Sequence, residues 1–223
     1  MTESTAFGSS LATRVRSSLS AVTVEPPGDD IEMLDAFARA TWSGLGEPGD
    51  AMVGMVTRVL GPWHALSLVI EGATADRILA SVRDSDSALE FDDDDLSLEA
   101  IDEALERWKP RLSEQESLAH LARAQRVGAQ LLLPTHTLWP QALADLADHG
   151  PVALWLRGQE NSLAGLDRSV SVVGARASTG YGEHVTMEIV DGLCDRGLAI
   201  VSGGAYGIDG MAHRAALATE GST

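Results

Sequence analysis

Two successive strand–loop–helix units between Val170 and Leu217 constrain the fold of this chain more than any other feature. Ser169–Val173 is a β-branched run and Leu198–Val201 is a second apolar run, and both have the length of buried strands. Each run is followed by a glycine-containing loop and then by a segment with helical spacing of apolar residues. This alternation is typical of an open parallel sheet whose strands are connected by helices.

The two loops, 174–182 and 202–207, have the composition of phosphate-binding loops. Glycines let backbone N–H groups approach a ligand closely, and a helix start supplies free donors and partial positive charge. Arg176 stands in the first loop, where its guanidinium can pair with a phosphate. The loops contain neither the dinucleotide fingerprint G-x-G-x-x-G nor a Walker lysine. We therefore predict a phosphate site beyond the carboxyl ends of the strands.

Asp209 and His213 lie four residues apart and would share one face of the helix after the second loop. A catalytic pair is one interpretation, but no nucleophile stands beside them, so a local hydrogen bond or a helix-start acid is favoured. Glu183 and Glu188 fit a solvated helix face. We predict no catalytic residue.

The charge balance argues at first against a nucleic-acid ligand. The chain has 33 acidic and 16 basic residues, a net charge of −17. Most of the acidic excess lies before residue 106, so the C-terminal half can still present a local positive face. Cys194 is the single cysteine, which excludes an internal disulfide, and no Cys/His cluster surrounds it, so no metal site is expected. Without a long apolar run or a signal-peptide core, we expect no membrane span and a cytoplasmic location.

Composition and periodicity divide the chain into four parts. We expect a disordered tail over 1–28, an N-terminal helical domain of helix-hairpin-helix or sterile-alpha-motif type over 29–83, an acidic linker and helix start over 84–105, and a partial Rossmann-like DNA-binding domain over 106–223. The fold class is therefore α/β, with an incomplete Rossmann-like parallel sheet preceded by a small all-helical domain. Such helical domains contact DNA backbone or another protein, although the pattern alone favours simple packing. The run Asp92–Asp95 does not match a calcium loop and is interpreted as part of a solvated linker.

The expected elements follow from the apolar spacing and from Gly and Pro breaks. The first predicted helix begins at Asp30. Further helices are predicted over Ala51–Leu60, Trp63–Ile70, Thr74–Ser81, Leu98 to near Pro110, Glu114–Val127 and Trp139–Ala147. Short strands are predicted at Gln130–Leu133 and Pro151–Arg157.

The residues around the two loops resemble the DNA-processing protein A family, also called DprA or Smf. The first family loop, Gly-Ser/Ala-Arg followed by Tyr-Gly, stands here as Gly174-Ala175-Arg176 and Tyr181-Gly182. The second signature, Ser-Gly-x-Ala-x-Gly-Ile-Asp-x-x-Ala-His, is complete from Ser202 to His213. Trp139-Pro140, Pro151–Gly158 and Gly44–Asp50 also look like family segments, so the resemblance covers roughly residues 30–223.

The resemblance implies a single-stranded-DNA-binding protein of natural transformation and recombination. Family members form homodimers and load the recombinase RecA onto DNA, and the resemblance implies neither catalysis nor a cofactor. By motif position, the residues that would hold DNA phosphates are Gly174, Ala175, Arg176, Ser178, Ser202, Gly203, Gly204, Ala205, Tyr206 and Gly207.

Two departures from the family pattern stand out. Tyr206 occupies a position where many members carry a basic residue, and a tyrosine could stack on a base instead. The sequence stops at Thr223, where the family continues with further strands and helices. We therefore expect a truncated product or a fragment, with an exposed sheet edge and without much of the dimer surface.

Two alternative functions remain open from the sequence. Related Rossmann-like folds with glycine loops hydrolyse nucleoside monophosphates to free base and ribose phosphate, but the Gly-Gly-Gly-x-x-Gly run typical of that group is absent. The other alternative is an inactive truncated remnant.

Overall fold

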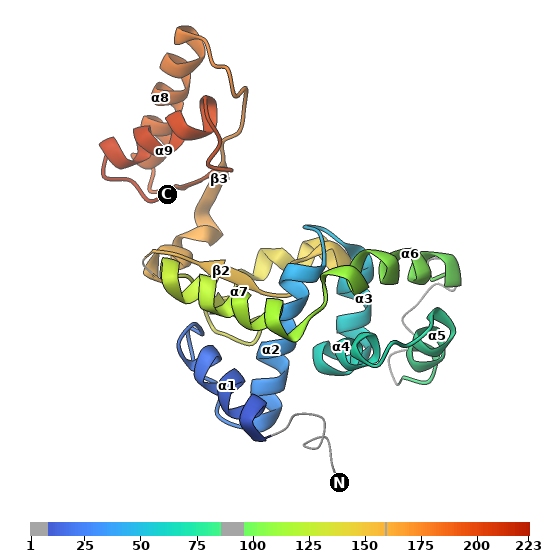
Figure 1. Cartoon of the computed structure of the whole chain (residues 1–223). Coiled ribbons are helices and arrows are strands. Elements are labelled where there is room, and N and C mark those ends of the chain that lie inside the picture. Colours follow the sequence, from blue (N-terminus) through green and yellow to red (C-terminus); the bar gives the residue numbers. More distant parts are fainter. Residues whose placement is uncertain (1–8, 86–95, 159) are drawn as a thin grey trace. The chain divides into compact units, whose positions relative to one another are not determined.

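The chain forms two compact units, 1–157 and 158–223, and Figure 1 shows their elements. The structure is a computed structural model that describes residues 9–85, 96–158 and 160–223. The boundary after Arg157 corrects the predicted start of the second domain at residue 106. Residues 106–157 belong to the first unit because α7 packs on α1 and α2, and the segment after β1 packs on α3. The acidic run Asp92–Asp95 lies outside the described residues.

The first unit is mainly helical. Its elements are α1 (Ser9–Ser20), α2 (Asp30–Leu45), α3 (Ala51–Leu60), α4 (Pro62–Ile70), α5 (Ala75–Arg83), α6 (Leu98–Trp108), the 3-10 segment η3 (Lys109–Arg111), α7 (Glu114–Val127), β1 (Gln130–Leu132), the 3-10 segment η4 (Gln141–His149) and β2 (Leu154–Leu156).

Side-chain caps explain why these helices begin where they do. Asp29 accepts a hydrogen bond from the backbone N–H of Glu32, and Asp50 accepts from the N–H groups of Met52 and Val53. At the other end of a helix, Gly128 ends α7 in the left-handed conformation. The predicted helices from Asp30 to Val127 are confirmed, whereas the segment after Trp139-Pro140 is a kinked 3-10 helix instead of an α-helix.

The predicted disordered tail over 1–28 is wrong for its described part. Residues 9–20 form α1, and Val15, Leu19 and Val22 are buried in the core of the unit. Thr23 then forms a parallel bridge to Leu131 in β1. Val15 and Leu19 lie one turn apart on the same face of α1, and Val22 follows the helix. These buried residues anchor a segment whose Ser and Thr content is typical of a mobile tail.

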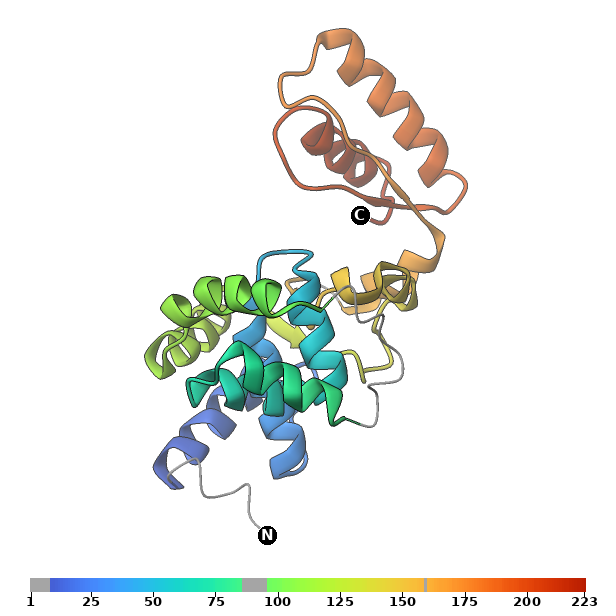
Figure 2. The same cartoon turned by 90° about the vertical axis from the view of Figure 1, so that its right-hand side faces the viewer.

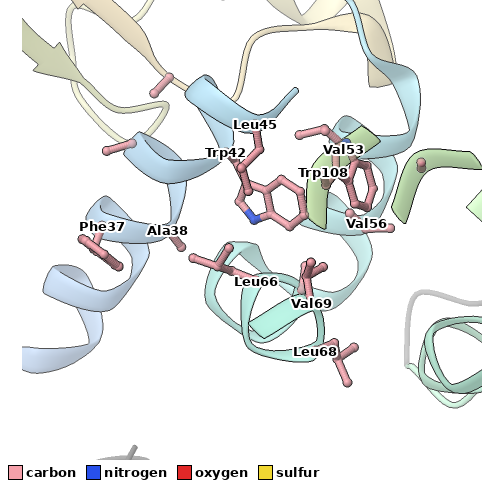
Figure 3. Packing of buried hydrophobic residues seen from close by; sticks show 14 of the residues in the cluster. Phe37, Ala38, Trp42, Leu45, Val53, Val56, Leu66, Leu68, Val69 and Trp108 are labelled. Carbon is pink, nitrogen blue, oxygen red and sulfur yellow. The ribbon is translucent and has the colours of Figure 1, made fainter. Parts of the chain in front are cut away.

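The core of the first unit is built around two tryptophans, shown in Figure 3. Trp42 of α2 and Trp108 of α6 are each 1% exposed, and their rings meet edge to face with centroids 4.9 Å apart. The Trp42 Nε1–H donates to the backbone carbonyl of Pro62 at 3.0 Å, so the buried indole keeps a hydrogen bond. Leu66 and Val69 of α4 pack beside Trp42 in the same view.

β1 and β2 close the first unit and are not part of the parallel sheet. They pair antiparallel, with Gln130 opposite Leu156 and Leu132 opposite Leu154. The 3-10 segment η4 between them is tied to α3, because Asp148 accepts two hydrogen bonds from the guanidinium of Arg58, at 2.8 and 3.0 Å. The strands were predicted as strands, but their partner could not be read from local periodicity.

The second unit contains the predicted parallel strands. Its elements are η5 (Glu160–Arg168), β3 (Ser169–Ser171), α8 (Gly180–Cys194), β4 (Ala199–Val201) and α9 (Ile208–Ala218). β3 and β4 pair in parallel, with Ser169 opposite Ala199 and Ser171 opposite Val201. Helix α8 connects the two strands, and α9 packs against α8, as Figure 2 shows.

The core of the second unit is small. Val190 and Ile200 are buried together with the alanines of α9, which are Ala212, Ala215 and Ala216. β3 is shorter than predicted and only half-buried, and Val173 beyond its end is 72% exposed. The expectation of a buried strand is therefore wrong for β3, which within the described residues pairs with β4 alone.

Within the described residues, no helix taken alone has the length and apolar composition to cross a membrane. Helices α3 and α4 reach that length and composition only when they are counted together, and the chain bends by 109° between them, at Gly61. Both helices contribute to the core of the first unit.

Candidate functional site

The two glycine loops of the second unit are fastened to each other at the ends of β3 and β4. The carboxylate Oδ1 of Asp209, at the start of α9, accepts a hydrogen bond from the backbone N–H of Gly174 at 3.2 Å. The N–H of Ile208 donates to the carbonyl of Ala175 at 3.1 Å. The hydroxyl of Ser202 donates to the carbonyl of Val172 at 2.7 Å. Residues after the second strand thus hold the backbone of the loop after the first strand.

Gly207 of the second loop packs directly on the backbone of the first loop. A Cβ atom at this glycine would lie 2.2 Å from the carbonyl oxygen of Ala175 and 2.5 Å from that of Arg176. Its φ of +82° is also a conformation that other residues rarely adopt. Gly207 therefore allows both the turn into α9 and the direct packing of one loop backbone on the other.

An open cavity of about 730 Å³ lies over the joined loops. Six of the ten predicted site residues line it: Arg176, Ser178, Gly204, Ala205, Tyr206 and Gly207. The other four, Gly174, Ala175, Ser202 and Gly203, lie in the loops without lining the cavity. The contacts described above show that Gly174, Ala175 and Ser202 connect the loops to their neighbours.

Two arginines give the cavity its positive charge. Arg176 comes from the first loop and Arg214 from α9, and both side chains are exposed at the cavity. Among the residues that the structure describes, neither guanidinium lies within ion-pair distance of a carboxylate. Their donors are therefore available to a phosphate.

The profile of the family described as DNA recombination-mediator protein A matches residues 130–223, which include both loops and the cavity. DNA processing protein DprA of Mycobacterium tuberculosis is 34% identical over 207 residues, which are 86% of this chain and 46% of that protein. Protein Smf of Escherichia coli is 36% identical over 112 residues, 50% of this chain and 28% of that protein. Over residues 130–223, the chain matches the DprA/Smf family. The X-ray structure of DNA processing protein A from Streptococcus pneumoniae aligns with 82% of this chain and 53% of that one, at 22% identity and a TM-score of 0.46.

The chain spans less than half the length of the curated relatives it matches. The family match also crosses the boundary after Arg157, since its first residues, 130–157, are β1, η4 and β2 of the helical unit.

Arg214 and Glu183 line the cavity but were not predicted as site residues. Arg214 lies one helical turn after Gly210, which also lines the cavity, so i, i+4 spacing from the loop-to-helix junction would have found it. Glu183 was interpreted as part of a solvated helix face, and this is wrong. Its carboxylate is half-buried at the cavity and accepts a hydrogen bond from the hydroxyl of Ser178 at 2.8 Å.

Asp209 and His213 do not form a pair. Asp209 is 7% exposed and bonds to the first loop, while Nδ1 of His213 lies 2.7 Å from the hydroxyl oxygen of Thr223. Of the two favoured interpretations of Asp209, the local hydrogen bond is wrong, because its partner Gly174 lies 35 residues away. The helix-start acid is confirmed, because Asp209 stands in the first turn of α9. In the described parts of the chain, no group of three or more His, Cys, Asp or Glu side chains could hold a metal ion.

Proposed function

We propose that this chain binds single-stranded DNA at the cavity over its two glycine loops and acts, without catalysis, as a recombination mediator in natural transformation. The observation that carries the proposal is the pair of guanidiniums, Arg176 and Arg214, that face the cavity without a carboxylate partner among the described residues. Charge-assisted bonds to phosphate are the interactions for which such groups are suited.

The cavity also has an aromatic surface that suits unpaired bases. Tyr206 is 89% exposed on the second loop and lines the same cavity as the arginines. Unstacked bases can stack on such a ring, whereas the bases of a duplex are covered by their neighbours. Tyr206 therefore supports a single strand over a duplex as the ligand.

Fluorescence anisotropy with labelled oligonucleotides at low salt tests the proposal. The variants Arg176→Ala and Arg214→Ala each lose a charge-assisted contact, so we expect about ten- to a hundredfold weaker binding and a shallower salt dependence. Arg196→Ala is the matched control, because Arg196 lies in the same unit and its guanidinium binds the carbonyl of Gly192 instead of facing the cavity. If the chain binds no single strand at low salt, or if Arg196→Ala weakens binding as much as the other two, the proposal is wrong.

The proposal includes RecA as the protein partner and a homodimer as the assembly of longer family members. Both come from the family resemblance and need their own measurements. RecA ATPase activity on single-stranded DNA coated with a binding protein should rise when the chain is added. Sedimentation at increasing protein concentration tests whether this chain dimerises.

The alternative enzyme would release a free base from a nucleoside monophosphate and needs a carboxylate near the sugar. Glu183 places a carboxylate at the cavity, which is the one feature that favours this reaction. Incubation with the common nucleoside monophosphates, followed by chromatography of the products, discriminates between the two functions. We expect no free base, because the Gly-Gly-Gly-x-x-Gly run of that enzyme group is absent.

A further inference from the structure

The carboxylate of Glu183 is not expected in a site that binds only phosphate. Its carboxylate shares the cavity with Arg176 and Arg214, and a negative charge there repels a phosphate. No ion pair between Glu183 and either arginine is present in the described structure, so the carboxylate does not serve to neutralise them. Among the described residues, the one hydrogen-bond donor to this carboxylate is the Ser178 hydroxyl, which donates to Oε1 at 2.8 Å.

The contact with Ser178 also fixes the place of the carboxylate. Ser178 lies in the first loop, and Glu183 lies in the first turns of α8, which begins at Gly180. The hydrogen bond therefore joins the loop to its own helix and leaves Oε2 and the remaining lone pairs for a ligand donor. A half-buried carboxylate of this kind is stabilised when a second donor reaches it.

The cavity thus combines three chemistries: two guanidiniums, the exposed ring of Tyr206 and a carboxylate acceptor. A nucleotide has the matching parts, which are an anionic phosphate, an aromatic base and donors on the edge of the base. We propose, on the basis of the DNA-binding function above, that the cavity holds a whole nucleotide of the strand and that Glu183 selects guanine.

Guanine is the base that a carboxylate fits best. Its Watson–Crick edge presents two adjacent donors, N1–H and the N2 amino group, which can face both oxygens of one carboxylate. In adenine and cytosine the single amino donor stands next to a ring nitrogen acceptor, and in thymine the single N3–H stands between two carbonyls. These acceptors repel the second carboxylate oxygen. The same guanine donors are occupied by cytosine in a duplex, so the selection also requires a single strand.

The test uses the full 223-residue chain and oligodeoxythymidylates of about 16 nucleotides, a length within the site sizes known for single-strand-binding folds. In otherwise identical strands, widely spaced thymines are replaced by guanine, by hypoxanthine or by adenine. Hypoxanthine keeps the N1–H of guanine and lacks the amino group. Wild-type chain should bind the guanine strand about tenfold more tightly than the thymine strand, with hypoxanthine between them.

Glu183→Gln is the decisive variant. It keeps an oxygen for the Ser178 hydroxyl but removes the charge, so the guanine preference should disappear while binding of the thymine strand stays equal or becomes tighter. A variant that fails to fold would weaken binding of both strands. Glu188→Gln is the matched control, because Glu188 is exposed on the same helix and lies beside His184 at 3.6 Å. It should keep the preference.

Each remaining outcome is decisive. Equal binding of all strands by the wild type, a preference that survives in Glu183→Gln, or a preference that is lost equally in Glu188→Gln would overturn the guanine selection and leave DNA binding intact. Absence of binding to every strand would instead refute the DNA-binding function on which the selection rests.

Discussion

The arginines of the two units have opposite surroundings. In the helical unit, Arg39, Arg58, Arg77, Arg107, Arg111 and Arg123 each lie within ion-pair distance of an aspartate or a glutamate. In the second unit, Arg176 and Arg214 face an open cavity without such a partner among the described residues. Net charge alone is therefore a poor guide to ligand class, because the acidic excess lies mainly before residue 106, in the unit where most arginines lie beside a carboxylate.

The hydrophobic cores of the two units also differ, in size and in the kind of side chain that they bury. The helical unit buries two tryptophans among many aliphatic side chains, whereas the second unit buries mainly alanines around Val190 and Ile200. The sequence provides a probe for the first unit, since all five tryptophans lie before residue 158. Tryptophan fluorescence therefore reports on the first unit, and amide hydrogen exchange of residues 158–223 reports on the second.

Trp42→Ala should have the largest effect on stability, and only in the helical unit. Removal of this buried indole leaves a cavity beside Trp108 and should lower the free energy of unfolding by about 3–5 kcal/mol. Urea unfolding followed by tryptophan fluorescence measures the loss. Trp139→Ala, at a half-buried site, should cost less. If DNA affinity falls together with the stability of the first unit, the two units are not independent and the comparison fails.

Asp209→Ala should be the next largest effect and should act in the second unit. The change leaves the N–H of Gly174 without its acceptor and removes one of the two hydrogen bonds between the first loop and α9, which should cost about 2–3 kcal/mol. Amide hydrogen exchange of residues 158–223 and the anisotropy assay should both change, while tryptophan fluorescence stays as in the wild type. Asp191→Ala removes an exposed carboxylate from α8 as a control. An equal loss in both variants would mean that the effect comes from charge and not from the bond to Gly174.

Gly204→Ala should have a smaller effect that isolates backbone strain. Gly204 has a φ of +67°, and a Cβ atom there would meet nothing within 4 Å. The expected cost is about 1 kcal/mol, from the left-handed conformation alone. Gly207→Ala adds a collision with Ala175 and should abolish DNA binding. Similar unfolding curves for the two variants would show that the loops can separate without loss of the unit.

His120 should produce the smallest effect, a weak dependence of the first unit on pH. Burial lowers the pKa of His120 below its usual value of 6.5, Arg123 lowers it further, and Glu116 opposes the shift. Below about pH 6.5 the unfolded chain thus binds a proton more readily than the folded chain, so this residue removes stability as the pH falls. Unfolding of wild type and His120→Gln between about pH 5 and pH 7.5 should show a steeper loss in the wild type. Parallel pH profiles would contradict the assignment.

The sequence predicts local elements of this chain better than their partners. Caps and apolar spacing locate α2 and α7, whose boundaries depend on nearby residues such as Asp29 and Gly128. The antiparallel partner of β1 and its bridge to Thr23 depend on residues far apart in the chain, which periodicity does not encode.

The candidate site follows the same rule. The glycines and Arg176 were predicted because they are consecutive in a recognisable loop. Arg214 lines the cavity because it lies on the face of α9 that is turned toward the loops. Glu183 lines the cavity from the start of α8, where it accepts the hydrogen bond of Ser178. Side chains that come from helices next to a loop therefore need the structure before they can be assigned.

The close packing of Gly207 on Ala175, together with the bond from Gly174 to Asp209, also limits how this region can be exchanged or evolve. Each loop is part of the surface on which the other loop packs, so neither loop can be replaced alone. A chimera that takes residues 174–182 from a relative needs residues 202–209 from the same relative. For the same reason, substitutions in the two segments should arise in compensating pairs along a lineage.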